Sequence, residues 1–175
     1  MGGPRRPRAS RFARLAGAAA LFLAGCATTG PPATLSHTFD SPEALARVVL
    51  TALEERDQAT LLALPLSDTE FRTIVWPELP SSRPEVNLPV AYAWGDLRTK
   101  SLGHLGATLN RWGGKRLELA GVEFRGETTA YATYSVHRDP VVRVRVEGGE
   151  PERVRLFGSI LERDGRFKLF SYVVD

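Results

Sequence analysis

Cysteine is nearly absent from this sequence, because its 175 residues include a single one, Cys26. An internal disulfide needs two cysteines, so a folded domain here has to be stabilised by its hydrophobic core. Histidine is also scarce, and His37, His104 and His137 are scattered along the chain, whereas a metal site needs three or four converging ligands. Catalytic motifs of the G-x-S-x-G, H-E-x-x-H and phosphate-loop types are missing as well. The sequence therefore predicts no metal, no cofactor and no catalytic residue.

Acidic residues are missing from the first 25 positions, although the whole chain has 20. This stretch carries five arginines, and residues 15–23 after them are apolar or small. A basic start followed by a short apolar run is typical of a secretory signal peptide. The run is too short to cross a bilayer as a helix, which takes about 20 residues. Arg5 and Arg6 leave a twin-arginine signal as an alternative, although Pro7 stands where that signal has apolar residues.

The apolar run ends in Leu23, Ala24, Gly25 and Cys26 instead of an ordinary small-x-small cleavage site. These four residues resemble the lipobox of bacterial lipoprotein signals, which is an aliphatic residue, two small residues and a cysteine. The resemblance implies diacylation of Cys26, cleavage before it and acylation of the new amino terminus. Several acyl chains make a stable anchor, since each buried methylene contributes about 0.8 kcal/mol. The alternative is an apolar start with an incidental thiol.

Removal of the signal changes the charge balance. The chain has 23 basic residues, of which 18 remain without the five arginines of the first 25 positions, against 20 acidic ones. The mature protein is then slightly acidic, so nucleic acid is not expected as a partner. Ala27 follows the cysteine where Asp would imply retention in the inner membrane. The resemblance thus implies a lipid-anchored protein of the bacterial cell envelope, in the outer membrane and facing the periplasm.

These patterns divide the chain into three parts. Residues 1–25 are the predicted signal peptide. Residues 26–39 are the lipidated cysteine and a flexible tether, rich in small residues and proline. Residues 40–175 are of a size that suits one domain, and no internal repeat divides them.

Helix signals fill the first half of this domain. Residues 40–43 supply a capping side chain, a proline for the first turn and an acid near the positive end of the dipole. Residues 45–53 continue with helical spacing. Shorter helices are predicted after Asp57 and after the capping box at residues 67–70. A fourth helix is predicted within residues 94–112, where two glycines stop it.

Alternating apolar and polar residues predict strands from Lys115 onward. Asp164 and Gly165 form the two-residue signal of a hairpin turn, which aligns Ile160 with Leu169. Short connections predict one antiparallel meander. Its five strands are expected at 115–125, 128–138, 141–146, 153–162 and 166–174.

The same alternation predicts the register and the two faces of the sheet. A loop of odd length around residues 148–149 pairs Val144 with Val154 and Arg145 with Arg153. One face is apolar and is expected to pack on the helices. It comprises Val144, Val154, Leu156, Ile160, Phe167, Leu169 and Val173.

The opposite face combines arginines with aromatic residues. Such residues are enriched in interface cores, so this face predicts contact with a second copy or another envelope protein. The alternatives are a solvated face neutralised by Glu147, Glu150, Glu152 and Glu162, or contact with anionic lipid headgroups. The predicted interface residues are Arg143, Arg145, Arg153, Arg155, Phe157, Phe170 and Tyr172.

Helices followed by a curved antiparallel sheet, ending in the hairpin at residues 161–168, resemble the nuclear transport factor-like, or cystatin-like cone, superfamily. The likeness is one of architecture and covers residues 40–175. It implies an α+β fold with N-terminal helices packed on a curved antiparallel sheet of about five strands. The fourth helix departs from the simplest pattern of that superfamily.

Enzymes of this superfamily place acid, histidine or tyrosine side chains inside the cone. The resemblance therefore implies an aromatic-lined pocket for a small apolar ligand, although ordinary core and surface aromatics are the alternative. His137 and Asp139, two residues apart where a strand ends, are interpreted as a structural polar pair. The predicted ligand-binding residues are Tyr92, Trp94, Asp96, Glu123, Tyr131 and Tyr134.

These observations predict a non-catalytic binding or scaffolding module in the envelope. The alternative is a small-molecule-binding enzyme with its pocket inside the cone. An enclosed cavity of several hundred cubic ångströms with a pKa-shifted acid or histidine would favour the enzyme. A filled interior with an exposed apolar strip would favour the binding module.

Overall fold

The computed structural model describes residues 1–3 and 34–174 of the chain. The predicted signal peptide, apart from its first three residues, and Cys26 with most of the tether therefore lie outside the described residues. The chain divides into two units, Met1–Pro32 and Ala33–Asp175, and every described helix and strand belongs to the second.

The predicted starts of the first two helices are confirmed. Helix α1 (Pro42–Glu54) begins after Ser41, whose hydroxyl accepts a hydrogen bond from the Ala44 N–H at 3.0 Å. Helix α2 (Gln58–Ala63) begins after Asp57, which caps it through the N–H of Thr60. Both caps satisfy N–H groups that have no partner within the helix.

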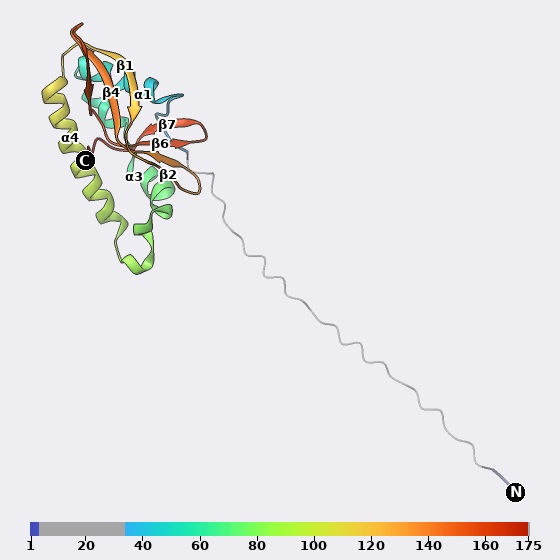
Figure 1. Ribbon diagram of the computed structural model, residues 1–175. Coiled ribbons are helices and arrows are strands. Elements are labelled where there is room, and N and C mark those ends of the chain that lie inside the picture. The colour runs from blue at the N-terminus through green and yellow to red at the C-terminus, as the bar shows by residue number, and fades with distance from the viewer. Residues whose placement is uncertain (4–33, 175) are drawn as a thin grey trace. The chain divides into compact units, whose positions relative to one another are not determined.

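Helix α3 (Asp68–Glu70) opens with the predicted capping box and continues as a π-helical turn, η1 (Phe71–Val75). Three 3-10 turns occupy the proline-rich segment after it: η2 (Trp76–Glu78), η3 (Pro80–Ser82) and η4 (Pro84–Val86). Helix α4 (Val90–Trp112) begins earlier than predicted, directly after Pro89, and ends at Gly113 as expected. In Figure 1 it is the long helix along one side of the domain.

The mixed α+β class is confirmed, but the strands form two antiparallel sheets instead of one five-stranded meander. The described strands are β1 (Leu117–Phe124), β2 (Thr128–Ala130), β3 (Ser135–His137), β4 (Pro140–Val146), β5 (Pro151–Val154), β6 (Ile160–Arg163) and β7 (Arg166–Leu169). One sheet has the order β1-β4-β5 and the other the order β2-β3-β6-β7. Figure 1 shows β1 beside β4, and β6 beside β7.

Two predicted strands are each broken in the structure. The segment 128–138 folds back on itself as the hairpin β2–β3, closed by a hydrogen bond from the Tyr131 N–H to the Tyr134 carbonyl. The segment 153–162 is interrupted at residues 155–159, so that β5 and β6 belong to different sheets. Alternation of side chains does not reveal these breaks, because apolar residues continue through them.

The register of the first sheet differs from the prediction. Arg143 lies opposite Arg153, and Arg145 lies opposite Pro151. The predicted pairing of Arg145 with Arg153 is therefore wrong by two residues, although arginine still faces arginine. The connection is tighter than expected because Glu147 and Gly148 both have positive φ, 51° and 78°.

The predicted hairpin register in the second sheet is confirmed. Ile160 lies opposite Leu169. Asp164 and Gly165 both have positive φ, 53° and 70°, as a type I′ turn requires. Past this ladder the N–H of Gly158 donates to the Ser171 carbonyl at 2.9 Å.

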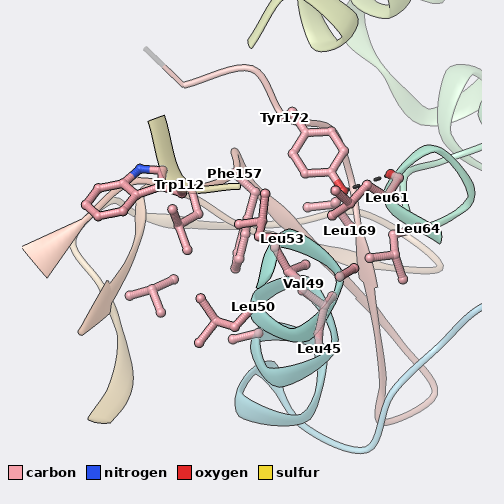
Figure 2. Close-up of a cluster of buried hydrophobic side chains, with 14 of the residues drawn as sticks. Leu45, Val49, Leu50, Leu53, Leu61, Leu64, Trp112, Phe157, Leu169 and Tyr172 are labelled. Carbon is pink, nitrogen blue, oxygen red and sulfur yellow. Dashed lines mark hydrogen bonds between the residues drawn. The ribbon is translucent and has the colours of Figure 1, made fainter. Parts of the chain in front are cut away.

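The main hydrophobic cluster joins α1, α2 and the end of α4 to both sheets (Figure 2). Most of the predicted apolar face is buried in it, including Val144, Leu156 and Ile160. A second cluster lies around Phe71, Ile74, Tyr134 and Leu161, with Trp94, Tyr131 and Phe170 partly buried against it.

Two residues predicted for the exposed face are buried instead. Phe157 and Tyr172 are both 1 % exposed and belong to the main cluster. The Tyr172 hydroxyl donates to the Leu61 carbonyl at 2.8 Å (Figure 2). Their assignment to the interface was wrong because regular strand ends before each of them, and alternation then no longer predicts which way a side chain points.

Helices capable of crossing a bilayer, judged by length and apolar character, do not occur among the described residues.

Candidate functional site where the tether joins the domain

The last residues of the predicted tether are part of the fold. Phe39 forms a β-bridge with Phe167, with N···O distances of 2.8 Å in both directions. Arg166 donates to the Thr38 carbonyl at 2.9 Å and forms an ion pair with Asp40. These contacts cover the edge of β7. The folded domain thus begins several residues before position 40. Its start depends on long-range contacts, which a local sequence pattern does not show.

A buried ion pair holds this segment from inside. Lys168 Nζ lies 3.6 Å from Glu70 Oε2, and the Lys168 side chain is fully buried. Lys168 also donates to the Ser36 carbonyl at 2.9 Å. Glu70 Oε1 accepts from the Ser36 N–H at 2.6 Å, and Oε2 accepts from the Ser67 N–H at 2.7 Å. The pair therefore connects β7, α3 and the start of the domain.

Burial affects both members of this pair. It raises the pKa of Glu70, but the N–H groups of Ser67 and Ser36 and the charge of Lys168 outweigh it, so the pKa of Glu70 lies below its usual range. Burial also lowers the pKa of Lys168, and the carboxylate of Glu70 only partly opposes this shift. Glu70 is therefore an ionised, fully bonded carboxylate and not a proton donor.

A hollow of about 440 Å³ lies directly beside this network. It is open to solvent and is bounded by the start of the domain, by the connection from α2 to α3, and by the first half of α4. Its lining residues are Ser36, His37, Leu62, Ala63, Pro65, Leu66, Ser67, Asp68, Trp94 and Arg98.

A smaller cavity of about 30 Å³ extends the hollow between α2 and α4. The two share Leu62, Leu66 and Trp94 among their lining residues. We call the apolar strip along them the α2–α4 seam. It consists of Leu62, Pro65, Leu66, Trp94, Leu97, Leu102 and Leu105.

The seam leaves apolar surface in contact with water. Leu62 is 43 % exposed and Leu102 is 42 % exposed, although both are large apolar residues. Arg98 is exposed at the rim of the seam and forms no ion pair with the residues that the structure describes. A basic residue at the edge of an exposed apolar strip suits an amphipathic partner.

The six residues predicted to bind a ligand do not meet in one place. Trp94 lines the hollow, but Tyr92 is 67 % exposed and outside it. Asp96 forms an ion pair with Lys100 one turn along α4.

Tyr131 and Tyr134 stack on each other at 4.7 Å in the β2–β3 turn. The hydroxyl of Tyr134 donates to the Val75 carbonyl, and burial raises its pKa. The two tyrosines thus pack against the second hydrophobic cluster. They do not line a cavity together with Trp94.

Glu123, the sixth of these residues, lies among the predicted interface arginines. Its carboxylate is 3.5 Å from both Arg143 and Arg153, which face each other across β4 and β5. Glu123 thus offsets the repulsion between the two arginines, a role predicted for other glutamates. All these groups are exposed, so each pair contributes at most about 1 kcal/mol.

Arg155 pairs with Asp139 at 3.8 Å. Arg143, Arg145, Arg153 and Arg155 are all exposed. These four residues form what we call the arginine face.

His137 has partners that the sequence did not indicate. Its Nε2 lies 2.7 Å from Glu162 Oε2, and its Nδ1 lies 3.0 Å from Thr128 Oγ1. The ring packs between Phe124 and Phe167. The predicted pairing with Asp139 is absent because cross-strand neighbours on β2 and β6 satisfy both nitrogens.

Comparison with protein-family models, with curated proteins and with solved structures found no match for this chain. Within residues 1–3 and 34–174, no three histidine, cysteine or acidic side chains come together in a way that could hold a metal ion. The site is therefore described by its own geometry: an open apolar seam beside the point where the predicted tether enters the fold.

Proposed function

We propose that this chain is a lipid-anchored protein of the bacterial cell envelope, located in the outer membrane and facing the periplasm. Its domain acts as a non-catalytic binding or scaffolding module. The observation that carries the proposal is the pattern at the start of the sequence, where a basic stretch without acids and an apolar run lead to the lipobox at 23–26.

The way the domain holds its own start supports this proposal. Ser36 is bonded to Glu70 and Lys168, and Phe39 is bonded to Phe167. A lipidated Cys26 would therefore be connected to a rigid point of the domain by only a short piece of chain. Such a link suits a domain that works next to the membrane.

The arrangement of polar groups supports binding over catalysis. His137 is hydrogen-bonded on both nitrogens, and Glu70 is bonded on both oxygens. The hollow of about 440 Å³ is open to solvent, and polar and apolar residues line it in about equal measure. Enzyme sites, in contrast, combine a concave pocket with perturbed groups aimed into it.

We keep the likeness to the cystatin-like cone superfamily as a proposal. It is supported by helices that precede antiparallel strands and by the terminal hairpin of β6 and β7. A fold shared with that superfamily would not by itself specify a function.

We also propose the arginine face as the surface for a second copy or another envelope protein. Arg145→Glu with Arg153→Glu should abolish a crosslink formed at this face in native envelopes. Arg47→Glu with Arg83→Glu changes the charge equally at two other exposed positions and should leave the crosslink in place. An unchanged crosslinking pattern in the first variant would contradict the interface.

The anchor is tested by replacing Cys26 with Ser and separating membranes from soluble protein. The natural sequence should sediment with the outer membrane and carry a mass increase on Cys26. The variant should lack this mass increase, keep its signal peptide and no longer sediment with the outer membrane. Thr28→Ser is the matched control and should stay anchored. Native protein with an unmodified, full-length start would contradict the proposal.

A further inference from the structure

We propose that the α2–α4 seam is the surface with which the domain rests on the lipid bilayer. The partner is the headgroup and upper acyl region of the leaflet that holds the anchor. This inference rests on the proposed lipid anchor at Cys26 and adds which side of the domain meets the membrane.

The position of the seam is the first argument. Ser36 and His37 line the same hollow as Leu62, Trp94 and Arg98. Ser36 is held there by Glu70 and Lys168. The chain that leads to Cys26 therefore leaves the domain at the edge of the seam.

The reach of the chain is the second argument. Ser36 lies ten positions after Cys26, and a fully extended chain over ten positions spans at most about 36 Å. A domain of this size has a radius of gyration of about 14 Å and hence a diameter of roughly 37 Å. The side of the domain away from Ser36 therefore cannot rest on the bilayer, because the chain would have to run around the domain over more than its full length. The seam, in contrast, lies near the membrane for every length of the link, at high effective concentration.

The chemistry of the seam is the third argument. Leu62 on α2 and Leu102 on α4 each expose over two fifths of their surface. Trp94 is half-buried and lines both the hollow and the smaller cavity. Tryptophan favours the membrane–water interface, because its ring is apolar and its N–H is polar. Arg98 adds an exposed guanidinium that can reach lipid phosphates while its stem stays on apolar surface.

The way α4 is packed is the fourth argument. Only Ser101, Leu105 and Trp112 are buried among its 23 residues. Ser101 accepts a hydrogen bond from the Tyr172 N–H at 3.0 Å, which fixes the inward side of the helix. Leu102 follows directly, lines the smaller cavity and keeps 42 % of its surface exposed.

A membrane fits this strip better than a protein partner does. The residues of the arginine face line neither cavity. The domain thus has a separate, charged surface for a protein, while the apolar surface lies where the anchored chain begins. Docking through the seam would leave the arginine face available to a partner in the periplasm.

The test uses the chain's own tryptophans, Trp76, Trp94 and Trp112. The lipidated full-length mature protein is reconstituted into vesicles of phosphatidylethanolamine and phosphatidylglycerol that contain brominated lipid. Bromine quenches tryptophans at the membrane interface. We expect quenching in the natural sequence and in Trp112→Phe, and its loss in Trp94→Phe.

A second variant tests the seam without changing Trp94, so that an effect of Trp94→Phe on folding does not decide the result. Leu62→Glu with Leu102→Glu changes only exposed side chains and retains Trp94. It should reduce binding of the seam to the bilayer about tenfold or more, seen as reduced quenching. Val86→Glu is the control, since Val86 is 52 % exposed and lines neither cavity.

Flotation of the vesicles separates the two proposals. Protein that floats with the vesicles while Trp94 stays unquenched overturns the seam and leaves the anchor standing. A dimer crosslink through position 102 in such protein would show that a second copy covers the seam. If protein purified from native membranes has an unmodified Cys26 and does not float with the vesicles, both proposals are overturned.

Discussion

Lys168 and Glu70 form an ion pair inside the domain, with 3.6 Å between Nζ and Oε2 and no exposed surface on the lysine. Both groups also bond to Ser36, so the pair fixes where the start of the domain enters the fold. Its geometry leads to the first two predictions.

Replacing Lys168 with Met should destabilise the domain strongly. The carboxylate of Glu70 would lose its countercharge while staying buried, which costs about 3–5 kcal/mol. Chemical denaturation followed by circular dichroism measures the change. Lys100→Met is the control, because Lys100 pairs with Asp96 in water and its loss should cost less than about 1 kcal/mol. Equal effects of the two substitutions would contradict the role of the buried pair.

Stability should fall in acid because of Glu70. Its pKa in the folded state lies below the reference value of 4.5. A carboxyl whose pKa is lowered by folding stabilises the protein at pH above its unfolded pKa. That contribution is lost as pH falls through the folded pKa.

The urea midpoint of the natural sequence should therefore drop below pH 4.5 more steeply than that of Glu70→Gln. The two curves should converge toward low pH. Parallel curves would show that the charge of the Glu70 carboxylate does not contribute to the stability of the domain.

Gly158 should not tolerate a side chain. A Cβ at this position would lie 2.2 Å from the Val173 carbonyl and 3.1 Å from that of Ser171. Gly158→Ala should cost roughly 1–3 kcal/mol through this overlap. Gly106→Ala is the matched control on α4, where nothing lies within 4 Å. It should stabilise the helix by about 0.5–1 kcal/mol. Thermal unfolding should show a lower midpoint for Gly158→Ala and a higher midpoint for Gly106→Ala than for the natural sequence.

Tyr172→Phe should reduce stability and leave association unchanged. The substitution removes the hydrogen bond to the Leu61 carbonyl and leaves that buried acceptor without a partner, which costs about 1–2 kcal/mol. Tyr92→Phe is the control, since Tyr92 is 67 % exposed. Weaker self-association without a loss of stability would instead place Tyr172 in an interface, as alternation of the strands suggested.

Features that depend on neighbouring residues could be predicted from the sequence. The cap of α1 at Ser41, the capping box at residues 67–70 and the hairpin turn at residues 164–165 all involve groups within four positions of one another. The start of α4 was placed too late, since Pro89 allows a helix to begin directly after it.

Features that depend on distant residues could not be predicted in this way. The candidate site joins the start of the domain, the connection from α2 to α3 and the first half of α4, and Trp94 is the one predicted ligand residue that lines it. Glu123 was expected in a pocket, yet it lies between Arg143 and Arg153. No local pattern shows which strands will be neighbours.

The sequence by itself determined the helix caps, the apolar stripes and the hairpin turn, because each is a property of one short stretch of chain. The pattern that predicts export is of the same local kind. Tertiary structure decided the split into two sheets, the burial of Phe157 and Tyr172, and the fixed entry of the chain at Ser36. Burial and ion pairing depend on which segments meet, and that depends on the free energy of the whole packed domain.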